Sequence, residues 1–390
     1  TPTYSSFNIL TFIGKMHLKR LQILNFKNLP EEEFGFIPGV NLLLGHNGQG
    51  KTNVLDAIHY LSLCKSCFNP IDSQNIMHNE AFFVIQGEFE HDTAVTEIYC
   101  GQKRGQKKIF KKNKKEYEKL ADHIGMFPLV IVSPADSDLV NEGSVTRRKF
   151  IDSIISQFDK QYLEYLIAYN KVLEQRNSLF RFGKGKTVNT DLVEVYNQQL
   201  SPLGQKIYEK RKQFIADFTP WFNTYFSGLS NAQNETVTLH YQSKLHDSTL
   251  EHLLQMSFDQ DRFLEYTTCG IHKDDIELKL NGYAVKKYGS QGQQKSFVIA
   301  LKLAQHAFIK HVKGFSPLLL LDDIFDKLDA NRVRYLLKLV TEKDFGQVFI
   351  TDTDLEKTPL LLAQQGTEAN VVRIEQGRKM EVNKTAIDVK

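Results

Sequence analysis

The sequence Gly45-His46-Asn47-Gly48-Gln49-Gly50-Lys51-Thr52 joins a short apolar run at residues 40–44 to residues 53–63, whose apolar side chains recur at helical spacing. Glycines allow the backbone to wrap closely around an anion, with successive N–H groups pointing inward. A helix that starts directly after such a loop presents its positive end to the same anion. This strand–loop–helix order predicts a phosphate-binding loop for a nucleoside triphosphate, with a chance glycine-rich turn as the alternative.

Side chains of this loop, and of a strand far along the chain, carry the expected chemistry. Lys51 would reach the β- and γ-phosphates of ATP, and the Thr52 hydroxyl would be a ligand of Mg2+. Residues 318–321 form an apolar strand that ends in Asp322 and Asp323. Asp322 is the natural magnesium partner, through water, and Asp323 could orient or deprotonate the attacking water. We therefore expect Lys51 and Asp323 to be the catalytic residues.

A third element is Ser290-Gln291-Gly292-Gln293-Gln294, at the start of a helix predicted for residues 293–310. A serine and a glycine at a helix start form a second anion-binding end. One phosphate cluster commonly uses one helix N-terminus. Two such loops in one chain therefore suggest that the second loop covers a nucleotide held by another subunit.

Strands alternate with helices at both ends of the chain, which predicts one α/β sheet with a mainly helical middle inserted into it. We expect a P-loop ATPase head from residues 16–140 and 270–390, and a helical arm from residues 141–269. Residues 1–15 are expected to be an upstream extension or tag.

The arm is expected to contain two long helices on either side of a flexible break at residues 183–186. Pro202 and Pro220 predict kinks or breaks in the second helix. The aromatic residues of the arm follow the spacing of a buried helix face, which predicts core positions for Tyr162, Tyr165, Tyr169, Trp221 and Phe222.

The composition is that of an ordinary globular protein, with 41% hydrophobic and 24% charged residues among 390. No apolar run approaches the roughly 18–20 residues that cross a bilayer, so we expect no membrane partner. Four cysteines in a chain of this length are not a disulfide framework, which favours a reducing, cytoplasmic location. Cys64 and Cys67 form a C-x-x-C without a second pair at suitable spacing, and incidental thiols are favoured over a metal or redox site.

Positive charge is concentrated in residues 103–119, the basic segment, which hold nine Lys or Arg against two Glu. Clustered lysines suit phosphate contacts that are sensitive to salt and read no sequence. A solvated lysine-rich hairpin, with its tip near Asn113, is the alternative. The candidate DNA contacts are Lys107, Lys108, Lys111, Lys112, Lys114 and Lys115.

Taken together, these motifs resemble the ABC-type ATPase heads of chromosome-maintenance proteins, and most closely the RecF family. The similarity extends from Met16 to the last strand. It rests on the phosphate loop, on residues 290–294 and on the run from Leu318 to Asp323 with Lys327-Leu328-Asp329 after it. It also rests on Asn25-Phe26-Lys27-Asn28, on Ser133-Pro134 and on Arg147-Arg148-Lys149-Phe150-Ile151-Asp152.

The sequence departs from the family pattern at several positions. Gly270-Ile271-His272-Lys273-Asp274-Asp275 replaces the usual Gly-Pro-His-Arg-Asp-Asp, and Asp326-Lys327 stands where Ser-Glu is usual. Lysine loses the bidentate geometry of arginine, which weakens the case for a phosphate contact there. Thr351-Asp352-Thr353 contains no histidine switch, and no glutamine accompanies the strand before Ser133. We therefore expect slow ATP hydrolysis that serves as a switch.

The resemblance implies an ATP- and Mg2+-dependent homodimer, with each nucleotide between the phosphate loop of one protomer and residues 290–292 of the other. It implies binding to double-stranded DNA and to gapped single-/double-strand junctions, in recombinational repair and replication restart. Action with RecO and RecR to load RecA, at the bacterial nucleoid, follows from the same resemblance. Beyond the phosphate loop itself, the implied nucleotide-contacting residues are Lys27, Asn28, Asn53, Ser290, Gln291, Gly292 and Gln293.

Two other functions are alternatives to this one. The first is another SMC-like ATPase, either a long-armed DNA tether or a nuclease-coupled relative. The short arm argues against a tether, and no cluster of metal-binding acids or histidines suggests a nuclease. The second is a small-molecule kinase with a phosphate loop, in which residues 290–294 and the distant Asp322-Asp323 pair would have no evident role.

Overall fold

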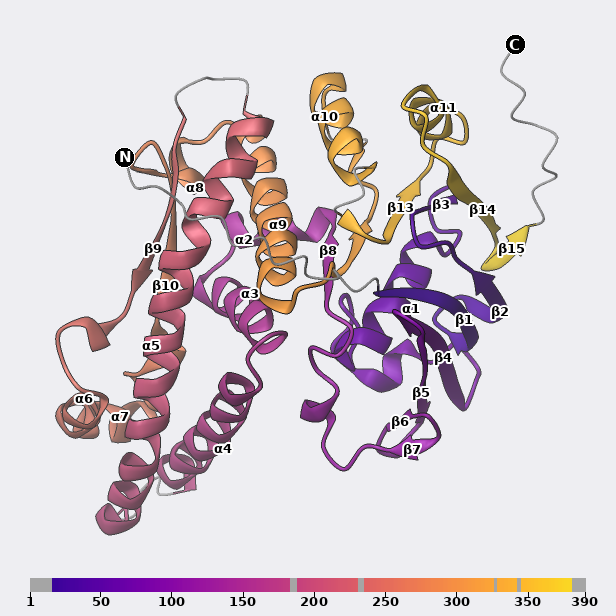
Figure 1. Cartoon of the computed structure of the whole chain (residues 1–390). Coiled ribbons are helices and arrows are strands. Elements are labelled where there is room, and N and C mark those ends of the chain that lie inside the picture. The colour runs from indigo at the N-terminus through magenta and orange to yellow at the C-terminus, as the bar shows by residue number, and fades with distance from the viewer. Residues whose placement is uncertain (1–15, 183–187, 231–234, 326–327, 342–344, 381–390) are drawn as a thin grey trace.

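The computed structural model describes residues 16–182, 188–230, 235–325, 328–341 and 345–380 (Figure 1). The expected extension at residues 1–15, the expected break at residues 183–186 and the Asp326-Lys327 pair lie outside the described residues. Within the described residues, no helix combines the length and the apolar character needed to cross a membrane.

A mixed six-stranded sheet carries both predicted nucleotide motifs. In sheet order its strands are β15 (Arg378–Met380), β14 (Ala369–Glu375), β3 (Val40–Leu44), β13 (Val348–Asp352), β12 (Leu318–Leu321) and β8 (Leu129–Val132). Neighbours from β14 to β8 pair in parallel, and β15 pairs antiparallel with β14. All residues of β3, β12, β13 and β8 are buried, which explains why β12 and β8 are apolar throughout and why β3 and β13 are mostly apolar. The sheet joins strands from both ends of the chain, as expected.

A second six-stranded sheet shows that the prediction of one sheet was wrong. Its order is β2 (Leu29–Gly35), β1 (Met16–Phe26), β4 (Phe82–His91), β5 (Ala94–Lys103), β6 (Ile109–Lys112) and β7 (Lys115–Glu116), all antiparallel. In its main strands buried residues alternate with mostly half-buried ones, so the sheet has one face to cover. Helix α1 (Lys51–Leu63) contacts β1 and β4 of this sheet and β8 and β13 of the mixed sheet. Eleven of its thirteen residues are buried, because both of its sides are covered.

The helical arm contains α2 (Asp138–Asn141), α3 (Ser144–Ser156), α4 (Lys160–Phe182), α5 (Thr190–Leu229), α6 (Leu250–Met256) and α7 (Phe258–Leu264). The two predicted long helices are confirmed, and α4 and α5 pack against each other (Figure 1). Of the expected core aromatics, Tyr162, Tyr169 and Phe222 are buried, while Tyr165 and Trp221 are partly buried against the core.

Of the kinks or breaks predicted at Pro202 and Pro220, the breaks are wrong, because α5 is a single helix that contains both prolines. Each proline removes a single backbone donor. Against that loss, the helix buries one face on α4 and another on α9 (Gln291–Lys313). The tertiary packing of α5 therefore outweighs the local preference of the prolines.

A separate three-stranded antiparallel sheet, which was not predicted from the sequence, lies beside the helical arm. Its order is β11 (Tyr283–Ala284), β10 (Asp275–Leu280) and β9 (Val237–Gln242). An Asn-Gly pair between two strands predicts a tight hairpin turn, and Asn281-Gly282 form that turn between β10 and β11, with both residues at positive φ. The sheet takes strands from either side of residue 270, where the sequence suggested a boundary between arm and head.

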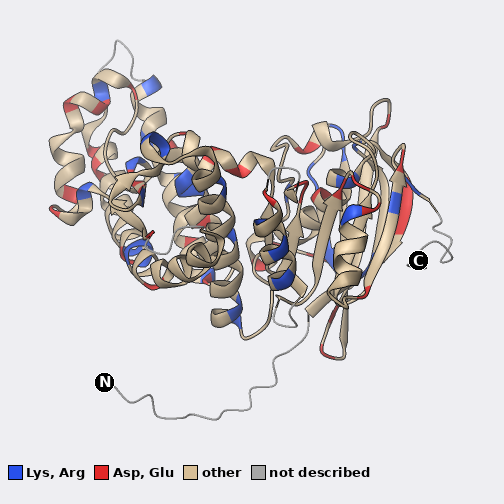
Figure 2. Cartoon of the chain, turned by 90° about the horizontal axis from the view of Figure 1, so that it is seen from above, with Lys and Arg blue, Asp and Glu red and all other residues tan. Residues whose placement is uncertain are grey.

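The remaining helices connect these layers. They are α8 (Val285–Tyr288), α10 (Ala330–Thr341), α11 (Lys357–Gln364) and the single-turn helices η1 (Asp72–Asn75), η2 (Leu120–Asp122), η3 (Pro134–Ser137), η4 (Lys244–His246) and η5 (Ile271–Lys273). Basic and acidic residues are interspersed over both the helical and the sheet parts of the molecule (Figure 2).

Candidate nucleotide-binding site

The predicted phosphate loop connects β3 to α1, as its sequence context required. Gly45, Gly48 and Gly50 have φ values of 157°, 77° and 111°. A side chain on Gly45 would place its Cβ 2.3 Å from the carbonyl oxygen of Ile374, so that position has no room for one. The left-handed residues turn the backbone into a concave loop at the N-terminus of α1, which is the arrangement that binds phosphate oxygens.

Lys51 is almost fully buried, with 3% of its surface exposed. Its ammonium donates hydrogen bonds to the carbonyl oxygens of Gly45 at 2.7 Å and His46 at 3.1 Å. The cation is thus held against the loop backbone, close to where phosphate charge is expected. His46, Asn47 and Gly48 are exposed on the same loop.

Asn28 and Asn53 support the loop from the side of the β1–β2 turn. The Asn28 amide donates to the Gly48 carbonyl oxygen at 3.1 Å, and the Asn53 amide donates to the Asn28 side-chain oxygen at 2.7 Å. Lys27 has a different partner, because its ammonium lies 2.6 Å from a carboxylate oxygen of Asp56 on α1. That carboxylate is fully buried and also accepts hydrogen bonds from Ser66 and from the Cys67 backbone. Lys27 is therefore anchored on the helix that follows the loop.

The Thr52 hydroxyl donates to a carboxylate oxygen of Asp322 at 2.8 Å. The hydroxyl of Thr351 lies 2.9 Å from the same oxygen, and Asp322 is 4% exposed. Burial raises the pKa of Asp322 above its ordinary value, because it disfavours the charged carboxylate. A cation bound beside Asp322 would have the opposite effect and favour the carboxylate. A buried carboxylate and a hydroxyl are hard oxygen donors of the kind that Mg2+ prefers. The residues present fit the expected magnesium ion.

Asp323 lies half-buried beside Asp322 in a left-handed conformation, with φ of 46°. Its backbone N–H donates to the Thr351 hydroxyl oxygen at 2.9 Å, and its carboxylate lies 3.2 Å from the same hydroxyl. The residue borders a cavity of about 450 Å³ that Gln291 and Gln294 of α9 also line. A carboxylate beside a cavity that admits water can act as the predicted base.

Ser290 caps α9, as the sequence suggested, and its side chain accepts from the Gln293 N–H at 3.2 Å. The Gln293 side chain bonds back to the Ser290 N–H at 2.8 Å and to Glu235 at 2.5 Å. A Cβ on Gly292 would lie 3.3 Å from the Arg332 guanidinium, which pairs with Asp329 at 2.8 Å. Within the described residues, no hydrogen bond or ion pair joins residues 290–293 to residues 45–53. Among the described residues, the N-termini of α1 and α9 thus have separate hydrogen-bond partners.

The basic segment forms the predicted hairpin of β6 and β7, with Asn113 and Lys114 at positive φ in its turn. Lys108 differs from the other candidate DNA contacts because its ammonium donates to the Cys64 carbonyl at 2.6 Å and pairs with Asp72 at 3.0 Å. Lys107, Lys114 and Lys115 are exposed, while Lys111 and Lys112 are half-buried. Of the two C-x-x-C thiols, Cys67 is exposed and Cys64 is buried, and burial raises the pKa of the Cys64 thiol to about 12, which disfavours its reactive thiolate form.

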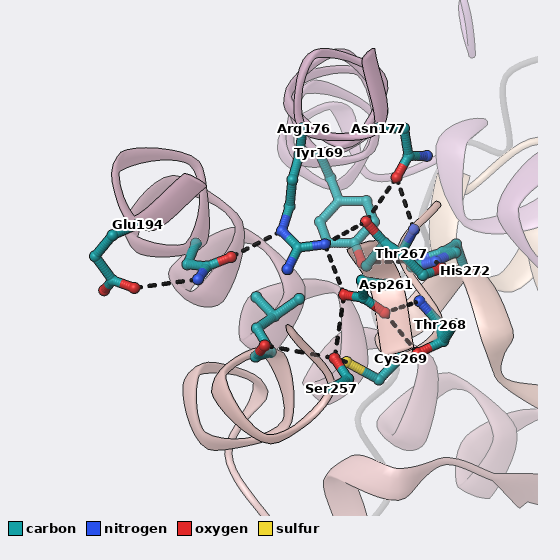
Figure 3. A network of polar contacts seen from close by, with 12 residues as sticks. Tyr169, Arg176, Asn177, Glu194, Ser257, Asp261, Thr267, Thr268, Cys269 and His272 are labelled. Atoms are coloured by element: carbon teal, nitrogen blue, oxygen red, sulfur yellow. Dashed lines mark hydrogen bonds and ion pairs between the residues drawn. The ribbon is translucent and has the colours of Figure 1, made fainter. Parts of the chain in front are cut away.

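The motif at residues 270–275 contributes His272 to a polar network that includes the buried Arg176 and Asp261 (Figure 3). His272 bonds to the Tyr169 hydroxyl at 2.9 Å and to the Thr267 carbonyl at 3.0 Å. Thr267 in turn accepts from the fully buried Arg176, which pairs with Asp261 at 2.8 Å. Arg147 forms a bidentate pair with Asp275, at 2.8 and 2.9 Å. These contacts give the motif a structural role in the arm.

Thr351 is the site residue that the sequence reasoning missed. Its hydroxyl contacts both Asp322 and Asp323, since β13 lies between β3 and β12. The carboxyl ends of parallel strands meet at one edge of a sheet, so its place at the end of an apolar strand was the available signal.

Comparison with known proteins adds to this geometry. Residues 17–359 match the family model described as RecF/RecN/SMC N terminal domain. A Flavobacterium johnsoniae protein named DNA replication and repair protein RecF is 50% identical over 348 residues, which cover 89% of this chain and 97% of that protein. A Parabacteroides distasonis protein of the same name is 50% identical over 362 residues, with coverages of 93% and 98%.

Solved structures show the same relationship in three dimensions. The recombination mediator protein RecF of the RecFOR pathway, solved with ATP, has a TM-score of 0.86 at 30% identity and covers 95% of this chain and 98% of its own. The Smc head domain of Pyrococcus furiosus has a TM-score of 0.53 at 16% identity, with coverages of 94% and 96%. At that identity the likeness concerns the fold alone. The predicted ABC-type ATPase head fold is thereby confirmed.

Proposed function

The chain belongs to the RecF family of DNA replication and repair proteins, and from that premise we propose that ATP closes two copies of it on DNA. The contact between Thr52 and Asp322 carries the proposal, because it brings the phosphate loop and the acidic strand end into one site. Lys51 then neutralises phosphate charge, and the loop N–H groups bind phosphate oxygens. ATP in the related RecF structure supports this choice of nucleotide.

Magnesium is the expected companion of ATP in this site. Thr52 and Asp322 would hold it, directly or through water, and the ion would neutralise charge that develops on the phosphates. Asp323 accepts a proton from the attacking water, and Thr351 holds the two neighbouring carboxylates in place. Hydrolysis is slow, because the glutamine and the histidine that are usual in the family are missing from the strand ends. Its role is to return the ATP-bound dimer to the open state.

The second half of each site comes from the partner subunit. Ser290 and Gly292 present the N-terminus of α9, and in the part of the chain that the structure describes no hydrogen bond joins them to the phosphate loop. A second protomer would place this helix end against the bound triphosphate, where its positive end stabilises the γ-phosphate. ATP binding and dimerisation are then one event, since the nucleotide forms part of the interface.

The dimer acts on duplex DNA and favours junctions beside single-stranded gaps, together with RecO and RecR in the loading of RecA. Relatives named for DNA replication and repair, and a RecF structure assigned to the RecFOR pathway, support this assignment. Because its substrate is chromosomal DNA, the dimer acts in the bacterial cytoplasm. The exposed lysines of the basic segment are the proposed contacts with DNA phosphates.

Binding to gapped and to blunt duplex DNA, with and without Mg·ATP, tests this function when the oligomeric state is measured in the same samples. We expect tight binding only with ATP, in step with dimer formation, and a preference for the gapped duplex. Equal binding without ATP, or turnover stimulated by a metabolite and not by DNA, would reject it. A preference for intact duplex with nuclease cleavage would favour another SMC-like ATPase.

A further inference from the structure

The turn between β14 and β15 is bonded directly to the phosphate loop. The Gly377 N–H donates to the main-chain carbonyl of Gln49 at 2.9 Å, and the Gln376 N–H donates to the side-chain oxygen of the same glutamine. Gln376 and Gly377 have φ values of 49° and 76°, so this tight turn points two consecutive N–H groups at one residue. Both oxygens of Gln49 are thus engaged by the C-terminal hairpin.

The same hairpin confines the loop at two further points. The Ile374 carbonyl oxygen would lie 2.3 Å from a Cβ on Gly45, so β14 is packed against the start of the loop. A Cβ on Gly377 would lie 2.1 Å from the carbonyl oxygen of Asn28. Asn28 is the residue whose amide holds the Gly48 carbonyl. The loop therefore lies between the β1–β2 turn and the β14–β15 turn.

We propose that the β14–β15 turn positions the phosphate loop for nucleotide binding, with Gln49 as its point of attachment. Three glycines give the loop more conformational freedom than other residues would, and ordering it on binding costs affinity. Hydrogen bonds that fix the loop beforehand reduce this cost. Gln49 then acts as a positioning residue whose side chain faces the hairpin. This role rests on the proposed ATP site.

Two substitutions weaken the attachment from opposite sides. Gly377→Ala forces the turn away from Asn28. Gln49→Met keeps the side-chain length but removes the acceptor of the Gln376 N–H, and leaves the main-chain acceptor in place. We expect each to weaken the affinity for a fluorescent ATP analogue by on the order of tenfold. Two controls are matched to them. Gly366→Ala introduces a side chain at a similar φ of 67° with nothing within 4 Å of the new Cβ. Gln376→Asn keeps the backbone donor in a residue that tolerates the left-handed region.

Amide hydrogen exchange of residues 45–52, measured without nucleotide, provides a readout that does not depend on ATP binding. We expect faster exchange in Gly377→Ala and Gln49→Met, and wild-type exchange in both controls. Wild-type loop exchange in a folded Gln49→Met variant would overturn the positioning role, as would equal acceleration in Gly366→Ala. If the wild-type protein itself failed to bind ATP, the proposed function would fall, and the exchange result would still decide the role of the turn.

Discussion

The Thr52 hydroxyl donates a hydrogen bond to Asp322 at 2.8 Å, although the two residues are separated by 270 positions in the sequence. The sheet order explains the contact, since β3 and β12 lie on either side of β13 and all three run parallel. Their carboxyl ends meet at one edge, where Thr351 of β13 bonds to the carboxylate as well. The site is therefore a product of topology, and each of its parts can be tested separately.

Lys51→Ala should weaken ATP binding by on the order of 100-fold, because it removes charge-assisted hydrogen bonds to two phosphates. Dimerisation and stable DNA binding should be lost with it. Calorimetric titration with ATP and sedimentation velocity measure the two effects, and thermal unfolding checks that the variant is folded. A folded variant that still dimerised with ATP would separate the nucleotide from the interface.

Asp323→Asn should retain ATP binding and lower the hydrolysis rate by at least about 100-fold, the usual contribution of a general base. The ATP-bound dimer should then persist longer after free ATP is removed. Single-turnover hydrolysis and dimer lifetime can be followed on the same sample. Hydrolysis at the wild-type rate would remove Asp323 from the catalytic role.

The double change Lys114→Gln and Lys115→Gln should make the logarithmic dependence of DNA affinity on salt shallower. Each lost phosphate contact reduces the slope by about 0.9. Both lysines are exposed at the tip of the basic segment. The control is Lys206→Gln with Lys212→Gln on α5, which removes the same charge elsewhere. Equal slopes for the two double variants would indicate a net-charge effect and a merely solvated hairpin.

Stability should fall as the pH drops below about 6.5, because burial lowers the pKa of His59, His123, His272 and His306 to about 4. The unfolded chain binds these protons first, so the stabilisation is complete above pH 6.5 and is lost towards pH 4. His272→Gln should reduce the slope of unfolding free energy by up to about 1.4 kcal/mol per pH unit. Urea unfolding at pH 7, 6 and 5 measures this. The exposed His240→Gln is the control, and an unchanged slope for His272→Gln would contradict the assignment.

The sequence was sufficient for features that depend on local pattern. The glycine spacing of the phosphate loop, the Ser290 cap and the Asn281-Gly282 turn each require particular residue types at fixed positions, and the structure has them where predicted. The apolar runs of β3 and β12 likewise indicated buried strands.

Features that depend on long-range pairing could not be predicted in the same way. The separate antiparallel sheet follows from which strands pair, and alternation alone does not specify a partner. Lys27 pairs with Asp56 and Lys108 pairs with Asp72, so these two ammonium groups already have a partner within the chain. Neither aspartate belongs to a sequence motif that would have predicted the pair. Pro202 and Pro220 were misleading because packing of α5 overrides their local effect.

Mixing two inactive variants tests most directly whether each ATP site is shared between subunits. Lys51→Ala removes the phosphate loop's cation, while Ser290→Asp keeps a good helix cap but places negative charge where the γ-phosphate of the partner's ATP should lie. Neither variant should form ATP-dependent dimers alone. Their mixture should do so, because one intact site then forms from the loop of the Ser290→Asp protomer and the helix end of the Lys51→Ala protomer. Sedimentation velocity of the mixture with ATP, Mg2+ and gapped DNA should show this heterodimer. A mixture that stayed monomeric while both variants remained folded, or a Ser290→Asp variant that dimerised by itself with ATP, would contradict the shared site.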